Sequence, residues 1–180
     1  METLQNKIKS FLSDHFKDAG IIDPLVPDKP GMYCIRLKGG CKLPLKFQSI
    51  LESRTHNILY IGIATKSLKI RLLNQELRHK GHGTFFRGIG AILGFFPPKG
   101  SLRNKRNQNN YKFSPDDTIK IINWINENLE VNWLVSDVDL ESIKKSLIKN
   151  ISPLLNTQGN SEKLKELEDA RAGCKLWALA

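Results

Sequence analysis

Two short strings, each with a glycine and a tyrosine, constrain the fold of this chain more than any other feature. The string GMY at 31–33 opens one apolar run, GMYCIRL, and YIG at 60–62 lies inside another, NILYIGIA. Runs rich in β-branched and aromatic residues favour strands, and the glycines permit close backbone approach. We therefore predict two strands, the second of them short, apolar and central in its sheet.

The remainder of the chain alternates between helical patterns and polar connections. Apolar residues at helical spacing predict helices over 4–16, from Ser67, over 84–95, from Ser114, over 140–151 and over 161–177. The side-chain oxygen of Ser67 or Ser114 can accept a hydrogen bond from a backbone amide in the first turn of the helix that it precedes. Pro115 suits the first position of the helix that follows Ser114. A third strand is predicted at 131–135, an irregular connection or β-excursion at 41–57, and a long polar loop at 99–112.

These elements predict a single α/β (α+β) domain with a small, mainly antiparallel three-stranded sheet flanked by helices. A length of 180 residues suits one domain with a substantial core. No apolar run reaches the ~18 residues of a membrane span, and the first residues lack the apolar core of a signal peptide. Cys34, Cys41 and Cys174 have no zinc-ligand spacing, so we expect reduced thiols in a cytoplasmic protein.

The positive charge of the chain is confined to one segment. The net charge is +10, and the segment 66–112 holds eleven lysines and arginines against one acid, Glu76. The rest of the chain is balanced, with seventeen basic and seventeen acidic residues. A basic run is often only a solvated surface. The position of this segment directly after the second tyrosine string favours instead a surface that binds nucleic acid.

Three downstream residues complete an ordered set with the two tyrosine strings. Arg71 follows Tyr60 by eleven positions, Glu141 lies in the predicted helix over 140–151, and Asn156 follows the end of that helix. This order resembles that of the GIY-YIG nuclease superfamily, which includes intron-homing endonucleases and a few restriction enzymes. The resemblance implies a nuclease domain over 31–156, between a helical extension over 1–30 and a helical tail over 157–180. The connection between the tyrosines is longer than the tight hairpin of many family members.

The resemblance implies a role for each of five residues. Tyr33 would be the general base and Tyr60 its partner on the neighbouring strand, while Arg71 would hold the phosphate. Glu141 would bind a single Mg²⁺ or Mn²⁺ ion, and Asn156 would brace the site by hydrogen bonds. A phenol, with an ordinary pKa of about 10, needs a nearby cation or hydrogen bond to act as a base. The implied reaction is the hydrolysis of phosphodiester bonds in DNA, which we expect to be double-stranded.

Further basic side chains of the segment 66–112 are candidates for DNA binding rather than for chemistry. Phosphate contacts from lysine and arginine position a protein on DNA without reading its sequence. The predicted DNA-binding residues are Lys69, Arg78, Lys80, His82, Arg87, Arg103, Lys105 and Arg106. His79 and His82 are also candidates for proton transfer, whereas no cysteine or carboxylate completes a zinc site with them.

The same residues allow other interpretations. Tyr33 and Tyr60 could be half-buried strand aromatics. Lys69 competes with Arg71 for the phosphate, and Glu141 could serve only an ion pair with Lys145, one turn later. For the whole chain, the alternative is a catalytically inactive DNA-binding module of the same fold. An RNA-binding protein is favoured only by the basic loop, which lacks the aromatic residues that stacking on bases requires. The sequence indicates no oligomeric state.

Overall fold

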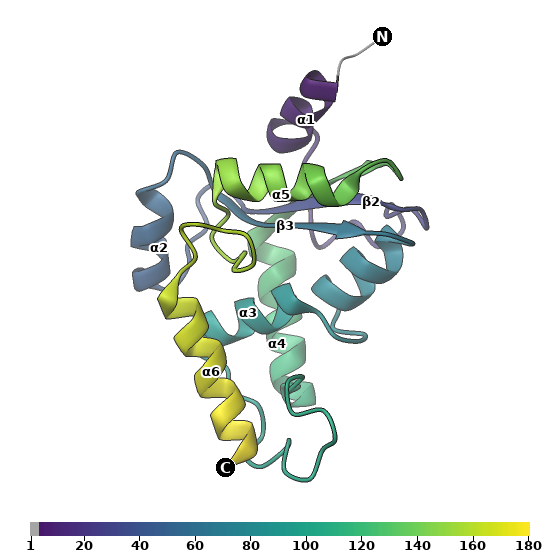
Figure 1. Cartoon of the computed structure of the whole chain (residues 1–180). Helices are drawn as coiled ribbons and strands as arrows, with labels where there is room; N and C mark the ends of the chain where they lie inside the picture. The colour runs from purple at the N-terminus through teal and green to yellow at the C-terminus, as the bar shows by residue number, and fades with distance from the viewer. Residues whose placement is uncertain (1–3) are drawn as a thin grey trace.

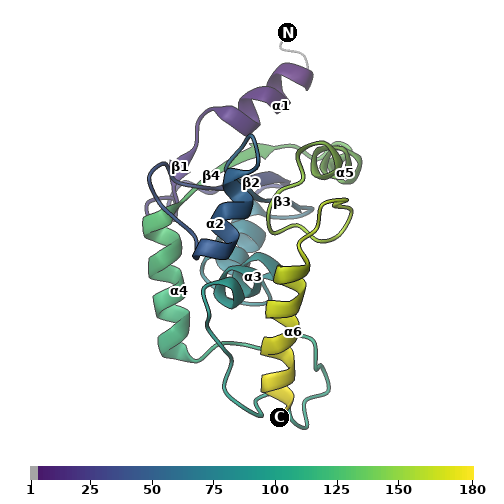
Figure 2. The same ribbon diagram turned by 90° about the vertical axis from the view of Figure 1, so that its left-hand side faces the viewer.

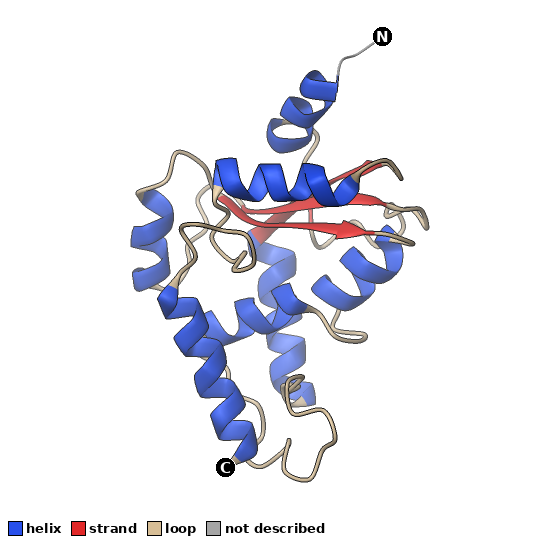
Figure 3. Cartoon of the chain, in the orientation of Figure 1, coloured by secondary structure: helices blue, strands red, loops and turns tan. Residues whose placement is uncertain are grey.

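The structure, a computed structural model that describes residues 4–180, is built around a four-stranded antiparallel sheet. Its strands, red in Figure 3, are β1 (Lys17–Asp18), β2 (Gly31–Leu37), β3 (Ile58–Ala64) and β4 (Leu129–Val135). They lie in the order β1-β4-β2-β3, as labelled in Figure 2. The predicted α/β class with antiparallel pairing is confirmed. The predicted number of strands is wrong by one, because β1 is only two residues long and leaves no pattern in the sequence.

The strand β3 lies at the edge of the sheet, and β2 lies in the middle, between β3 and β4. The predicted central position of the second tyrosine strand is therefore wrong. Six of the seven residues of β3 are buried although it is an edge strand, because helices pack on both faces of the sheet (Figures 1 and 2). An apolar run thus indicates burial on both faces and not a central position in the sheet.

Two groups of helices divide the core between the two faces of the sheet. One group is α1 (Leu4–Ser13) and α5 (Leu140–Ile151), and the other is α2 (Leu45–Glu52), η1 (Lys69–Leu77), α3 (Thr84–Ile92), α4 (Pro115–Asn128) and α6 (Lys165–Leu179) (Figure 1). Side chains alternate along β2. Tyr33 and Ile35 therefore join the larger apolar cluster with the second group of helices, while Met32 and Cys34 join the smaller cluster with α1 and α5.

The connection from β2 to β3 contains the helix α2 and no additional strand. The prediction of a β-excursion at 41–57 is wrong. Phe47 and Leu51 are four residues apart, so they lie on the same side of α2, and both are buried in the larger apolar cluster. Two buried side chains over two turns are too short a pattern to distinguish a helix from an irregular loop.

The other predicted helices are confirmed, and both serine caps form. Ser67 Oγ accepts a hydrogen bond from the Ile70 amide at 3.0 Å, and Ser114 Oγ accepts one from the Asp117 amide at 3.1 Å. The first helix ends at Ser13, earlier than predicted. Within residues 4–180, no helix combines the length and the apolar character that a bilayer span requires.

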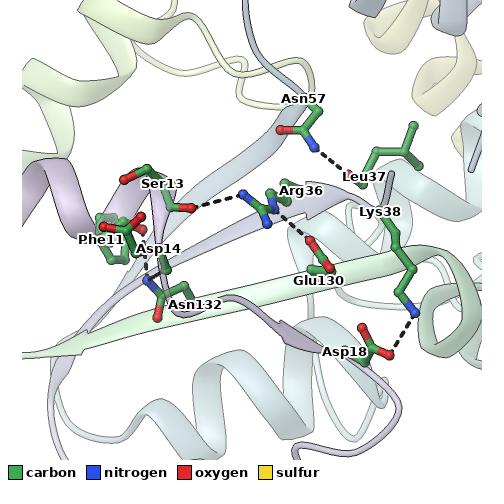
Figure 4. Close-up of polar contacts among 10 residues, drawn as sticks. All are labelled: Phe11, Ser13, Asp14, Asp18, Arg36, Leu37, Lys38, Asn57, Glu130 and Asn132. Carbon is green, nitrogen blue, oxygen red and sulfur yellow. Dashed lines mark hydrogen bonds and ion pairs between the residues drawn. The ribbon is translucent and has the colours of Figure 1, made fainter. Parts of the chain in front are cut away.

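Polar contacts fasten the segment before β2 to the sheet (Figure 4). Asn132 Nδ2, on β4, donates to the carbonyl oxygens of Phe11 and Asp14 at 3.0 and 2.9 Å. Arg36 on β2 forms an ion pair of 2.8 Å with Glu130 on β4. The end of α1 and the turn that follows it are therefore held against the same sheet that carries the tyrosines.

The basic loop between α3 and α4 packs against α6. The Leu102 amide donates to the carbonyl oxygen of Ala178 at 2.8 Å. Leu102, Tyr111 and Phe113 are buried in the larger apolar cluster, whereas the polar residues 103–109 between them are exposed. Apolar side chains thus anchor a loop whose charged residues face the solvent.

Candidate active site

A pocket of about 410 Å³ lies beside the edge strand β3. Tyr33 and Tyr60 line it from the sheet, Arg71 lines it from η1, and Glu141 lines it from the first turn of α5. Because α5 and η1 lie on opposite sides of the sheet (Figure 1), the pocket extends around the edge of β3. The structure therefore brings four of the five predicted catalytic residues to one cavity.

The two tyrosines come together through the register of β2 and β3. Tyr33 lies opposite Gly62, and Tyr60 lies opposite Ile35, so both tyrosine side chains are on the same face of the sheet. Their ring centroids are 6.3 Å apart, with an angle of 29° between the ring planes. Tyr33 has no exposed surface, and Tyr60 is 9% exposed. The α2 connection, although longer than a tight hairpin, thus allows the two tyrosines to lie side by side on neighbouring strands.

Gly62 provides the space that the Tyr33 ring occupies. A Cβ atom at position 62 would lie 2.3 Å from Tyr33 Cζ and 2.4 Å from its hydroxyl oxygen. Gly31 is similarly close to backbone, since a Cβ there would lie 2.3 Å from the Leu134 carbonyl oxygen. The glycine of each tyrosine string is therefore required by close packing, and the glycine at 62 directly places the phenol.

Arg71 is the cation that η1 brings to the pocket, which Lys66 and Lys144 also line. Its Nη1 donates to Gln75 Oε1 at 2.9 Å and to the His82 carbonyl oxygen at 3.3 Å, and its Nη2 forms an ion pair of 2.9 Å with Glu76 Oε1. The side chain remains one-third exposed. Lys69, the competing candidate, is exposed and does not line the pocket.

Glu76 is a member of this site that the sequence did not reveal. Its side chain is fully buried. Tyr33 Oη donates to Glu76 Oε1 at 3.4 Å, and the Phe85 amide donates to Glu76 Oε2 at 2.8 Å. Burial raises the pKa of Glu76, while the Arg71 charge and the amide hydrogen bonds oppose that shift. The only signal in the sequence was its position as the single acid in the basic segment 66–112.

The environment of both tyrosines favours the neutral phenol. Burial raises the pKa of Tyr33 well above its ordinary value, and the Glu76 carboxylate raises it further. The pKa of Tyr60 is raised for the same two reasons. Charge and hydrogen bonding from Arg71 lower both values but do not offset the burial. The Tyr33 hydroxyl is therefore not ionised to a phenolate in advance of the reaction.

Glu141 reaches the pocket from the opposite side of β3. Its side chain is 61% exposed and forms an ion pair of 3.3 Å with Lys144, not with the expected Lys145. Among the described residues 4–180, no group of three or more His, Cys, Asp or Glu side chains could hold a metal. A single carboxylate at an open pocket does fit Mg²⁺ or Mn²⁺, since a hard cation with few protein ligands keeps several waters. It does not fit zinc, which takes three or four nitrogen or sulfur ligands.

Asn156 lies outside the pocket and contacts the backbone of β3. Its Oδ1 accepts from the Ile61 amide and its Nδ2 donates to the Ile61 carbonyl oxygen, both at 2.9 Å. The neighbouring Leu155 amide donates to the Leu59 carbonyl oxygen at 2.7 Å. Asn156 is buried, so its amide holds the strand directly beside Tyr60 and Gly62 without touching the cavity.

The predicted DNA-binding residues divide into two groups. Lys69, Lys80, His82, Lys105 and Arg106 are exposed. Of these, His82, Lys105 and Arg106 line a second cavity of about 500 Å³ between the basic loop and the start of α4. Arg71 of the active-site pocket contacts the carbonyl oxygen of His82, which lines this second cavity.

The remaining three arginines have partners within the protein or are partly buried. Arg78 donates to the Ala19 carbonyl oxygen at 2.7 Å and pairs with Asp23 at 2.5 Å, and its side chain is only 10% exposed. Arg87 is half-buried, and burial lowers its pKa. Arg103 is exposed and donates to the Ala180 backbone oxygen. Arg78 therefore fixes η1 to the segment after β1.

His79 does not line the pocket either. Its ring stacks on Phe86 with 4.3 Å between the ring centroids and 12° between the planes. Burial, together with the charges of Lys112 and Arg87, lowers the pKa of His79 to about 4. The imidazole therefore packs as a neutral aromatic ring against α3.

Comparison with known proteins gives one match. The family model described as the GIY-YIG catalytic domain matches residues 31–173. The match covers most of the chain and runs past position 156 into α6, which packs against α3. No curated protein and no solved structure matches the chain significantly. The chain therefore belongs to the GIY-YIG catalytic domain family, a family of nucleases.

Proposed function

We propose that the protein is a metal-dependent endonuclease that hydrolyses phosphodiester bonds of double-stranded DNA. The observation that supports this proposal most is the meeting of Tyr60, Arg71 and Glu141 with Tyr33 in one pocket. Packing in a sheet would account for two buried aromatic rings. It would not account for a cation and a carboxylate that reach the same cavity from helices on opposite sides of the sheet.

In this proposal, Arg71 holds the scissile phosphate. Its planar guanidinium presents several donors that match phosphate oxygens, and its one-third exposed side chain lines the pocket. Tyr33 accepts a proton from the attacking water. Tyr60 stacks beside Tyr33 and limits the movement of its ring, and Asn156 holds the strand that carries Tyr60.

Glu141 is the residue proposed to hold one Mg²⁺ or Mn²⁺ ion per active site. Such an ion, when bound, neutralises charge that develops on the phosphate and on the leaving oxygen. Lys144 pairs with the Glu141 carboxylate in the protein alone, so a cation at this position competes with Lys144. Glu141 is exposed and lies outside both apolar clusters, so its replacement should leave the fold intact.

The second cavity supplies a path for the DNA that flanks the scissile phosphate. Lys105, Arg106, Lys112 and His82 line it, and no acidic residue does. Because these groups are exposed and lie beside Arg71 through the His82 backbone, a strand bound at Arg71 can continue over them. Contacts of this kind give affinity that depends on salt and little on sequence.

The proposal is tested by incubating the purified protein with supercoiled plasmid in Mg²⁺, with and without excess EDTA. Nicked or linear products should form only with the metal. Tyr33→Phe and Glu141→Ala should each reduce the rate by about 10² or more, since a positioned base and a metal ligand are lost. Tyr111→Phe, which removes another buried phenol, and Glu127→Ala, on the exposed side of α4, are matched controls that should retain full activity.

A catalytically inactive DNA-binding module is a second candidate, and two observations favour it. Tyr33 is completely buried as a neutral phenol, and Glu76 already neutralises Arg71. The same assay separates the candidates when DNA binding is measured alongside cleavage. Tight, salt-dependent binding without any metal-dependent nicking would identify the binding module and refute the nuclease.

A further inference from the structure

The buried carboxylate of Glu76 contacts two residues of the proposed site but has no part in the reaction described above. Its Oε1 accepts from both Tyr33 Oη, at 3.4 Å, and Arg71 Nη2, at 2.9 Å. Its Oε2 accepts from the Phe85 amide at 2.8 Å. The carboxylate is thus held by η1, α3 and β2 at once, and it is the only acceptor that the structure gives to the Tyr33 hydroxyl among residues 4–180.

The burial of Tyr33 creates a difficulty for a simple general base. Removing the phenolic proton to solvent would leave a phenolate inside the protein, which burial disfavours. The hydroxyl proton of Tyr33 is already directed at Glu76, however. A phenol oxygen that donates in one direction can still accept a proton through its lone pairs, and Tyr33 also lines the pocket.

We propose that Glu76 is a positioning residue that takes the phenolic proton of Tyr33 while Tyr33 takes a proton from the attacking water. This inference rests on the proposed nuclease function. One O–H bond of the water breaks and an O–H bond forms on Tyr33 Oη, as the original phenolic proton moves to Glu76 Oε1. The water oxygen bonds to phosphorus, the bond from phosphorus to the leaving oxygen breaks, and that oxygen takes a proton from solvent. Tyr33 is neutral before and after the step.

The charges around Glu76 suit this transfer. Arg71 and Arg87 face the carboxylate, together with the two neutral tyrosines. Burial raises the pKa of Glu76, which makes it a stronger proton acceptor than an exposed glutamate. Once Glu76 is protonated, the positive charge of Arg71 is no longer compensated. The guanidinium then acts on the phosphate with its full charge as negative charge develops there.

A purely structural role for Glu76 predicts different behaviour. In that case the carboxylate would only connect η1 to α3 through Arg71 and the Phe85 amide. The variant Glu76→Gln keeps the volume and one acceptor oxygen but cannot take the proton. The amide nitrogen of this variant would face a donor, either Arg71 or the Phe85 amide, so a structural role predicts lower stability, with the pH dependence of the rate unchanged in the folded variant.

The experiment measures single-turnover nicking of plasmid in Mg²⁺ between pH 4.5 and 8.5. The wild-type rate should fall as the pH drops through the raised pKa of Glu76, because the carboxylate must be ionised to accept the proton. In Glu76→Gln the rate should be lower by about 10² or more, and this acid limb should disappear. DNA affinity in EDTA should stay within about threefold or increase, since Arg71 loses its anionic partner. Glu127→Gln is the matched control and should behave like the wild type.

A second measurement uses only the wild-type protein, in case Glu76→Gln does not fold. The single-turnover rate is measured in mixtures of H₂O and D₂O, and two transferring protons should give a curved dependence on the deuterium fraction. A linear dependence, no isotope effect, or a Glu76→Gln variant with the wild-type rate and acid limb would each overturn the inference. Failure of the proposed function is recognised separately, because the wild-type protein itself would then not cut DNA.

Discussion

Gly62→Ala is the substitution whose effect the structure defines most closely. The new Cβ would lie 2.3 Å from Tyr33 Cζ, 2.4 Å from Oη and 2.6 Å from Cε2. Ordinary van der Waals contact begins at 3.4 Å, so the ring must move by about 1 Å. The ring has no exposed surface and stacks on Tyr60, so this movement must disturb that packing or displace the ring toward the pocket that it lines.

The displacement should cost both stability and activity. Overpacking of a close-packed site typically destabilises a protein by about 1–3 kcal/mol. A shift of about 1 Å in a reacting group can reduce the rate by about 10²-fold, and here the shifted group is the Tyr33 hydroxyl. Urea denaturation gives the change in free energy of unfolding. Plasmid nicking in Mg²⁺, at a temperature where the variant is folded, gives the change in rate.

Gly39→Ala is the matched control for this substitution. No atom lies within 4 Å of a Cβ at position 39, and the residue is exposed. Its stability should change by less than about 0.5 kcal/mol, with wild-type activity. Activity of Gly62→Ala within about threefold of wild type would show that the Tyr33 hydroxyl is not in the reaction, and an equal loss in Gly39→Ala would point to a general effect of the added methyl group.

Two further predictions concern DNA affinity and pH. Neutralising Arg103, Lys105 and Arg106 together should weaken DNA binding almost equally for all DNA sequences. It should also reduce the magnitude of the slope of log K against log salt by roughly one unit per lost phosphate contact. An unchanged slope would mean that this basic loop only faces solvent. His79 has its pKa lowered from 6.5 to about 4 in the folded protein, so the unfolded chain binds more protons between these values and stability should fall as the pH drops from 6.5 towards 4. Allowing for partial exposure, we expect the free energy of unfolding, measured by urea denaturation, to be lower by about 1–2 kcal/mol at pH 5 than at pH 7.5. An equal decrease in His79→Asn would refute this expectation.

Local patterns explain what could be predicted from the sequence. The tyrosine strands, the serine caps at 67 and 114 and most helices depend on residues close in the chain, and the structure has them as expected. The order of the strands depends on which segments cover the sheet. The apolar run of β3 therefore suggested a central strand, although long-range packing of η1, α3 and α5 buries this strand at an edge.

Glu76 was missed, and the protein partner of Arg78 was not foreseen, for one physical reason. Glu76 is recognisable only when Tyr33, on a distant strand, is seen to donate to it. Arg78 was expected among the DNA contacts because it lies in a basic segment, but Asp23, far away in sequence, binds its guanidinium. A charge in a sequence does not show whether its partner is solvent, DNA or another side chain. Only the folded chain distinguishes these cases.

The hydrogen bonds of Asn156 have a consequence for how this protein behaves in a crowded solution. An edge strand normally presents unpaired amide and carbonyl groups that a strand of another molecule can join, which leads to aggregation. Here Asn156 binds both backbone groups of Ile61, and Leu155 binds the carbonyl oxygen of Leu59. The Asn156 side chain and the Leu155 backbone amide thus occupy part of the place of a fifth strand. The edge of β3 is therefore blocked to strand addition at Leu59 and Ile61, while the pocket beside it remains open to a substrate.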